Sequence, residues 1–235
     1  MLNGNREFIM IDEQKVAYEE ILRLSELCQK DYQKRTIVVK GGPGTGKTVI
    51  AINLLAELTK KDQLVQYVSK NSAPRQVYLK KLKGQMKKSS IDNLFKGSGN
   101  YTEAGENMAH TLLVDEAHRL NEKSGMFHNL GENQIKEIIK AAYCSVFFID
   151  ESQRVTMDDI GSISEIEKWA IEEGSELHYL ELQSQFRCNG SDGYLAWLDN
   201  VLHIRDTANY DLEGIDYDIR ICDSPFEMRE SGIEK

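Results

Sequence analysis

The segment from Gly41 to Thr48 constrains the fold more than any other part of the chain, because it reads GGPGTGKT. It matches the pattern G-x-x-x-x-G-K-[ST], in which a glycine-rich backbone turns its amide N–H groups inward around phosphate groups. A β-branched run at 36–40 precedes this segment, and apolar residues at helical spacing follow it over 49–58. A strand, this loop and a helix together predict a P-loop domain that binds ATP. The expected phosphate contacts are Gly42, Gly44, Thr45, Gly46 and Lys47, with Thr48 as a magnesium ligand.

Strand-like and helix-like segments alternate along most of the chain. The spacing predicts helices at 13–34, 49–58, 73–83, 133–142, 163–173 and 193–202, strands at 36–40, 64–69, 111–114, 145–149 and 176–182, and a loop at 96–106. Alternation of this kind predicts an α/β fold with a mostly parallel sheet flanked by helices. Because ligand sites lie at the carboxyl ends of parallel strands, we expect 41–48, 115–118 and 150–153 to share one edge.

A second chemical signal is the segment LLVDEAH, at 112–118. An apolar strand here delivers two adjacent carboxylates at its end. Asp115 is expected to hold Mg²⁺ through water, and Glu116 to orient and polarise an attacking water molecule. Since activation of water suits hydrolysis, Glu116 counts against a kinase of small metabolites.

A third segment, FFIDESQ at 147–153, repeats the arrangement of an apolar strand followed by polar residues. Gln153 is expected to hydrogen-bond the γ-phosphate or the lytic water and so to sense hydrolysis. A polar loop without a chemical role remains the alternative.

The three segments GGPGTGKT, VDEAH and FIDESQ resemble motifs I, II and III of superfamily 1 helicases, whose motor domains are RecA-like P-loop NTPases. Weaker matches fall in the same order: a Q-motif with Gln14 at the adenine edge, motif Ia at 68–75, and motif IV at 183–187, whose Arg187 would reach the γ-phosphate. The segments SKNSAP, IDESQR and LQSQFRCNG, with DSPFEMRE, are similar to the bacterial ATPases related to the Schlafen group 3 helicase domain.

This resemblance implies a single strand of DNA or RNA as a partner, contacted at motif Ia. The implied contact residues are Asn71, Ser72, Arg75 and Lys80, within a cluster of basic residues that also contains Lys70, Lys81, Lys83, Lys87 and Lys88. A solvated helix face is the alternative for the cluster. Tyr67 and Tyr78 are candidates for base stacking, although core positions are the commoner role of such tyrosines.

The composition of the chain changes after about residue 204, where polar residues become frequent. We therefore expect a RecA-like motor domain at 1–204, and at 205–235 a linker with the start of a truncated second domain, including a strand at 217–222 and a helix from near Phe226. The resemblance implies a second RecA-like domain in cis that donates an arginine to the ATP site. Without it, we expect the chain to bind nucleotide and to hydrolyse it slowly.

The charge, hydropathy and cysteines of the chain limit the partners and the cellular location that we expect. The formal net charge of −9 argues against phosphate binding over the whole surface, although it allows a local basic groove. No apolar run reaches the roughly 18 residues that a membrane span needs, and the first residues do not resemble a signal peptide. The four cysteines, at 28, 144, 188 and 222, form no CxxC pair, so we expect free thiols and a cytoplasmic location.

Three functions remain open at this point. The first is a nucleic-acid-dependent ATPase of helicase type. The second is a nucleotide-gated switch that changes partner contacts without translocation, which the acidic charge and the glycine-rich 96–106 segment keep open. The third is a metabolite kinase, which Glu116 and Gln153 disfavour.

Overall fold

The computed structural model describes residues 10, 12–84, 86–125, 129–183, 192–204, 206–207, 210 and 222–233. It divides the chain into two compact units, residues 1–187 and 188–235. The second unit contains α7 (Asp192–Val201) and α8 (Pro225–Ile233), at the two places where the sequence predicts helices. The strand predicted at 217–222 lies almost wholly outside the described residues. A domain boundary after residue 204 stays a prediction.

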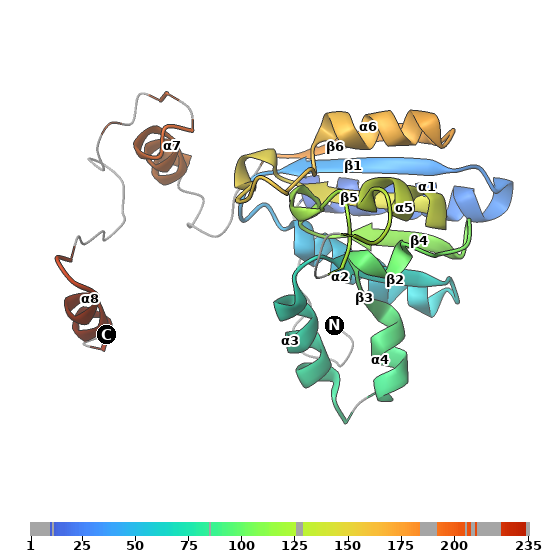
Figure 1. Cartoon of the computed structure of the whole chain (residues 1–235), viewed down its shortest axis with the longest axis horizontal. Coiled ribbons are helices and arrows are strands. Elements are labelled where there is room, and N and C mark those ends of the chain that lie inside the picture. The colour runs from blue at the N-terminus through green and yellow to red at the C-terminus, as the bar shows by residue number, and fades with distance from the viewer. Residues whose placement is uncertain are drawn as a thin grey trace. The chain divides into compact units, whose positions relative to one another are not determined.

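A six-stranded sheet forms the centre of the first unit (Figure 1). Its strands are β1 (Arg35–Gly41), β2 (Val65–Ser69), β3 (Phe95–Gly97), β4 (Ala109–Val114), β5 (Ala142–Ile149) and β6 (Glu176–Leu182). Their order is β3-β2-β4-β5-β1-β6, and all the pairings are parallel. The expected α/β fold is confirmed as a RecA-like sheet in which β5 separates the P-loop strand β1 from β4. The carboxyl ends of β1, β4 and β5 therefore lie next to one another.

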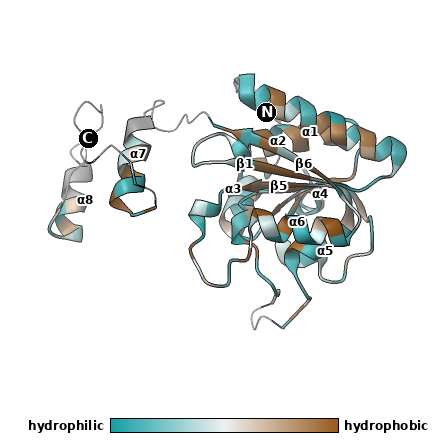
Figure 2. Ribbon diagram, turned by 90° about the horizontal axis from the view of Figure 1, so that it is seen from above, coloured by the Kyte–Doolittle hydropathy of each residue, from teal (hydrophilic) through white to brown (hydrophobic). Residues whose placement is uncertain are grey.

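Helices cover both faces of the sheet (Figure 2). On one face, α1 (Asp12–Asp31) and α2 (Lys47–Lys60) contribute fully buried side chains such as Ile21, Leu24 and Leu54. On the other face, α5 (Gln134–Ala141) and α6 (Ile163–Glu172) bury Ile135, Ile138 and Ile166, among others. The central strands are apolar on both faces because both are covered, as parallel sheets require.

The structure corrects the expectation of a loop at 96–106. Phe95–Gly97 is the edge strand β3, paired with β2, and a 3-10 helix η1 (Ser98–Tyr101) follows it. Tyr101 is buried, and its hydroxyl donates to Oε1 of Gln66 at 2.8 Å. A short helix α4 (Lys88–Leu94), which the spacing does not predict, leads into β3. Phe95 and Tyr101 flank a glycine-rich stretch. Two aromatic residues alone do not give a periodic apolar pattern, so the sequence does not predict these elements.

Two further expectations concern the chain as a whole. Cys28, Cys144 and Cys222 are free thiols, as predicted, whereas Cys188 lies outside the described residues. Among the described residues, none of the helices combines the length and the apolarity that a membrane span requires.

Candidate nucleotide-binding and catalytic site

The P-loop lies between the end of β1 and the start of α2. Gly44 and Gly46 have φ angles of 81° and 92°, in the left-handed region that favours glycine. At Gly46 an added Cβ would also overlap Nε2 of Gln14, so that the Gln14 side chain would have to move. The Nε2 atom of the buried Gln14 donates to the carbonyl of Thr45 at 2.9 Å, so the first turn of α1 is joined to the loop.

Lys47 lies inside the loop and is only 7% exposed. Its Nζ atom donates to the carbonyl oxygens of Gly41 and of Gly42, the latter at 2.7 Å. The hydroxyl of Thr45 also donates to the Gly42 carbonyl, at 3.0 Å. The only cation of the loop is thereby held at the amino end of α2, next to the loop's backbone N–H groups.

Asp115 directly follows β4 and connects the VDEAH segment to the P-loop. Its Oδ2 atom accepts the hydroxyl of Thr48 at 2.7 Å and the hydroxyl of Tyr67 at 2.6 Å, while Oδ1 accepts the backbone N–H of Glu116 at 3.1 Å. Burial raises the pKa of this carboxyl, and the donated hydrogen bonds offset part of the rise. Burial, with the Asp115 carboxylate, also raises the pKa of Tyr67, which therefore remains a donor.

The role of Tyr67 differs from base stacking. Its ring is fully buried in the core, 5.6 Å from the ring of Phe95 between centroids. Tyr78 stacks on the same phenylalanine, at 4.9 Å. The core alternative is therefore the observed one for Tyr67, and Tyr78 is packed against the same cluster.

Glu116 follows in a left-handed conformation, with φ 54° and ψ 46°. Such a conformation costs a non-glycine residue about 1–2 kcal/mol. Its side chain is 38% exposed, and Oε2 lies 3.0 Å from Nε2 of the buried His118. The Nδ1 atom of His118 accepts the backbone N–H of Asp150 at 3.3 Å, so the ring proton lies on Nε2 and points to Glu116.

The segment after β5 is organised around the side chain of Asp150. Its Oδ1 atom accepts the hydroxyl of Ser152 at 2.6 Å, and Oδ2 accepts Nε2 of Gln153 at 2.7 Å. Because β5 lies between β1 and β4, this segment stands between the P-loop and Glu116. The structure thus brings together Lys47, Thr48, Asp115, Glu116 and Gln153 at one edge of the sheet, whereas Arg187 lies outside the described residues.

A buried carboxylate that the sequence does not single out, Asp159, lies in the loop that follows this segment. Asp159, whose side chain is fully buried, lies 3.1 Å from Nζ of Lys70 and 3.3 Å from Nε of Arg119. The backbone N–H groups of Val155 and Thr156 donate to its Oδ2 atom. Burial alone would raise the pKa of Asp159, yet these N–H groups and Lys70 hold it below its usual range.

The same loop touches the segment of Glu116 and His118 directly. The N–H of Ile160 donates to the carbonyl of Leu120 at 2.8 Å. A Cβ on the next residue, Gly161, would overlap the carbonyl of Ala117. The backbone of the 154–161 loop therefore packs against the turn that positions His118.

Motif Ia begins where β2 ends. Asn71, Ser72 and Lys80 are exposed along α3 (Ser72–Leu82). Arg75 instead turns inward, where its guanidinium donates to the carbonyls of Ser69 and Lys96, the latter at 3.4 Å, and burial lowers its pKa. Of the basic cluster, Lys70 and Arg75 are thus engaged within the fold.

The oxygen donors of Thr48 and Asp115 suit Mg²⁺, a hard cation that binds few protein ligands and retains water or phosphate oxygens. The described residues hold no group of three or more His, Cys, Asp or Glu side chains that would bind a metal by themselves. A magnesium ion here would therefore depend on phosphate oxygens for much of its coordination.

Several solved structures are similar to this chain at low sequence identity. A DNA replication initiation factor is 18% identical, with a TM-score of 0.40 over 97% of this chain and 62% of its own. AMPPCP-bound DnaA from Aquifex aeolicus is 18% identical, with a TM-score of 0.42 over 99% and 65%. Domain III of the Thermotoga maritima replication initiation protein DnaA is 16% identical, with a TM-score of 0.40 over 96% and 84%. The chain thus spans less than two thirds of the first two structures.

No curated protein sequence matches the chain. The family model for the Schlafen group 3 DNA/RNA helicase domain matches residues 34–235, which include the P-loop, Asp115, Glu116 and the segment after β5. The chain therefore belongs to the Schlafen group 3 DNA/RNA helicase domain family, as a P-loop nucleotide-binding ATPase domain.

Proposed function

We propose that this domain binds ATP with Mg²⁺ and hydrolyses it, as the first motor domain of a nucleic-acid-dependent ATPase of the superfamily 1 helicase type. The observation that carries the proposal is the 2.7 Å hydrogen bond between the Thr48 hydroxyl and Asp115. It joins the first turn of the P-loop helix to the acid at the end of β4, which is the pair of groups that such ATPases use for magnesium.

The phosphates of ATP would lie in the nest formed by Gly42, Gly44, Thr45 and Gly46, at the amino end of α2. Fourteen residues of helix place their positive end there. Lys47 would exchange its carbonyl partners for the β- and γ-phosphates, which are stronger acceptors because they are charged. Gln14 would fix the adenine, next to a small groove lined by Asp12, Glu13, Val16, Ala17, Leu180 and Glu181.

Thr48 and Asp115 would hold the magnesium ion, which neutralises charge on the phosphates when bound. Glu116 would orient the attacking water, and His118 positions that carboxylate through the Nε2–Oε2 contact of 3.0 Å. Gln153 would report the γ-phosphate to the segment after β5. Arg187 would contribute a further positive charge at the γ-phosphate.

A single strand would cross the same edge at motif Ia, where Asn71, Ser72 and Lys80 are exposed. Arg75 would support that surface mainly by holding the ends of β2 and β3, since its guanidinium bonds their carbonyls. A second RecA-like domain in cis would complete the ATP site with an arginine, and a cytoplasmic location would follow from the free thiols.

The test is ATP turnover with and without single-stranded DNA and RNA, with Lys47→Ala and Glu116→Gln as reference variants. We expect a strand to stimulate turnover, Lys47→Ala to lose nucleotide binding, and Glu116→Gln to bind nucleotide without turnover. Turnover that ignores both strands would favour the nucleotide-gated switch. Phosphoryl transfer to a small acceptor would favour a kinase.

A further inference from the structure

The helices α3 and α4 form a hairpin at the β3 end of the sheet (Figure 1). The root of the hairpin is fixed to the sheet by two contacts. The ring of Tyr78 stacks on that of Phe95, and the guanidinium of Arg75 donates to the carbonyls of Ser69 and Lys96. The hairpin is therefore packed firmly against the domain, although Leu82 is the only buried residue of α3.

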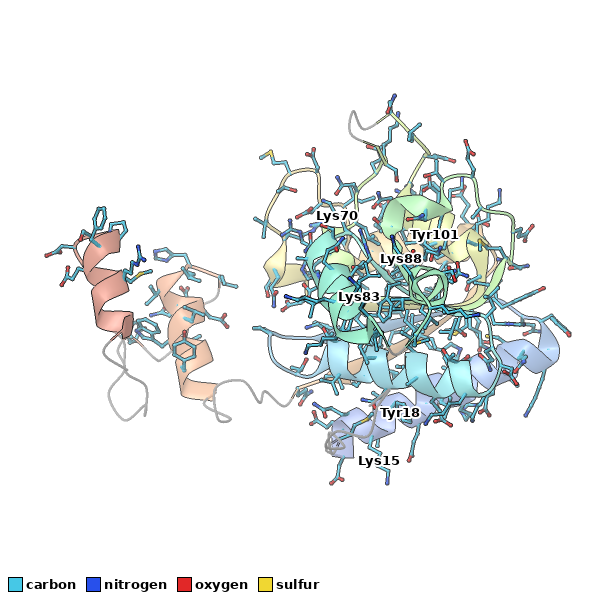
Figure 3. All side chains as sticks on the ribbon, turned by 90° about the horizontal axis from the view of Figure 1, so that it is seen from below. Lys15, Tyr18, Lys70, Lys83, Lys88 and Tyr101 are labelled. Carbon is cyan, nitrogen blue, oxygen red and sulfur yellow. The ribbon has the colours of Figure 1, made fainter. Side chains whose placement is uncertain are left out.

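A pocket with a volume of about 620 Å³ lies between the two helices, towards the turn that joins them. Its apolar side chains are Leu79, Met86 and Ile91, which pack against the core. Its polar lining consists of Gln76, Lys80, Lys83, Lys88 and Asp92. We call it the α3–α4 pocket; Figure 3 shows Lys83 and Lys88 on this side of the molecule.

The charge around the α3–α4 pocket is opposite to that of the chain. The segment 70–88 contains seven basic residues and no acidic residue, whereas the chain carries a net charge of −9. The lysines at the hairpin tip are exposed, and none of them forms an ion pair with a described carboxylate: Lys80, Lys81, Lys83, Lys87 and Lys88. The local positive potential therefore stays available for an anionic ligand.

The mixture of lysines and apolar side chains in the lining indicates which kind of anion the pocket would bind. A free phosphate would use the lysines and leave the apolar surface of the partly buried Leu79 and Met86 in water. A nucleotide would use both, since its base covers apolar side chains while its phosphates meet lysines. In addition, α3 begins at Ser72, at the strand ends where the motif Ia surface lies, so a strand leaving that surface along α3 reaches the pocket.

We propose that the α3–α4 pocket binds a nucleotide of the same single strand, with its phosphates on Lys80, Lys83 and Lys88 and its base on Met86 and its apolar neighbours. This site rests on the proposed function, because it extends the path of the strand beyond motif Ia. It separates strand binding from the ATP site, since no residue of the pocket belongs to the P-loop or to the edge around Asp115.

The first experiment compares two double variants by fluorescence anisotropy with labelled single-stranded DNA and RNA over a range of salt concentrations. Lys83→Ala with Lys88→Ala removes two lysines of the pocket, neither of which is an implied motif Ia contact. The matched control, Lys81→Ala with Lys87→Ala, removes the same charge from the same hairpin outside the pocket lining. We expect the pocket variant to bind about tenfold more weakly with a salt slope lower by about 1–2, and the control to change affinity by less than about threefold.

The second experiment tests the apolar surface with abasic strands of the same length. The wild-type protein should prefer the base-bearing strand, and Met86→Ser should remove most of that preference while leaving abasic binding in place. Thermal unfolding and affinity for an ATP analogue serve as folding controls, because a misfolded hairpin would alter the first and an indirect effect on the P-loop the second.

Four results would overturn the pocket assignment. Equal losses in both double variants would mean diffuse attraction, and no loss in either would place the strand elsewhere. If polyglutamate binding were lost in the Lys83→Ala and Lys88→Ala variant while strand binding was retained, the pocket would be an acidic peptide site. A wild-type protein that binds ATP but no strand would overturn both this site and the strand-dependent part of the proposed function, whereas loss of ATP binding alone in Lys47→Ala would leave the pocket unaffected.

Discussion

The Nε2 atom of His118 lies 3.0 Å from Oε2 of Glu116, while Nδ1 of the same ring accepts the backbone N–H of Asp150 at 3.3 Å. The ring is 1% exposed, so it has little freedom to turn. One buried imidazole thereby connects the carboxylate after β4 with the first residue after β5. Two contacts of this ring therefore join Glu116 to Asp150, whose carboxylate holds Gln153.

Replacing His118 with alanine should separate catalysis from binding. Glu116 would lose the donor that positions it, and the N–H of Asp150 would lose its acceptor. We expect ATP turnover to fall by about tenfold or more, as for a misplaced general base, with affinity for an ATP analogue changed by less than about twofold. Turnover under saturating ATP and equilibrium titration of the analogue measure the two effects.

His178→Ala is the matched control for this variant. His178 lies in β6 and its Nε2 atom is 3.4 Å from Oε1 of Glu176, so it also pairs with a glutamate but away from the ATP site. Its removal should leave turnover unchanged. If His118→Ala turned over ATP at the wild-type rate, the imidazole would be a core residue without influence on Glu116.

The sequence was sufficient to predict the parts of the site that depend on local backbone geometry. Positive φ angles at Gly44 and Gly46 follow from the glycine pattern of the P-loop, and the positions of Asp115 and Asp150 follow from apolar strands that end there. The parallel order of the strands then brings the three segments to one edge. These predictions required only short-range spacing and one topological rule.

The supporting contacts could not be predicted, because they join residues that are distant in the chain. Tyr67 reads as a core tyrosine, and only the pairing of β2 with β4 brings its hydroxyl to Asp115. Asp159 reads as a loop residue, and only the folded loop places it between Lys70 and Arg119. No residue spacing encodes either contact.

Asp115 and Asp159 should respond to pH in opposite ways. Burial raises the pKa of Asp115 above its unfolded value of roughly 3.9, so its contribution to stability is complete below that pH and is lost as pH rises. Asp115→Asn keeps a carbonyl that accepts from Tyr67 and Thr48 without the buried charge. We therefore expect its free energy of unfolding, relative to wild type, to increase as pH rises above about 4.

Asp159→Asn should show the reverse. The pKa of Asp159 is lowered, so its contribution to stability is present above about pH 4 and is lost as pH falls. Breaking this buried pair with Lys70 and Arg119 should cost about 3 kcal/mol near pH 7, and less in acid. Urea unfolding at several pH values measures both variants. Parallel pH profiles for the two would show that at least one of the carboxylates lacks the environment described.

Gly161→Ala should lower ATP turnover although Gly161 does not itself belong to the nucleotide site. The added Cβ would overlap the carbonyl of Ala117, so the turn that carries His118 must move. We expect a loss of about 1–3 kcal/mol in stability and a fall in turnover larger than any fall in nucleotide affinity. Gly105→Ala is the control, since nothing lies within 4 Å of its Cβ, and it should be neutral or slightly stabilising. Equal effects of the two substitutions would assign no special role to the close approach at Gly161.

Gln14 has two possible roles that one variant can distinguish. Its Nε2 atom donates to the carbonyl of Thr45 at 2.9 Å, which supports the P-loop for any nucleotide. Reading of the adenine edge would act on ATP alone. If Gln14 reads the base, Gln14→Ala should weaken ATP binding by about tenfold, the value of a lost hydrogen-bonding group, and leave GTP binding nearly unchanged. Titration of the wild type and the variant with both nucleotides measures this difference. A parallel loss for ATP and GTP would show that Gln14 acts only through the Thr45 carbonyl, and that the base is recognised by other residues.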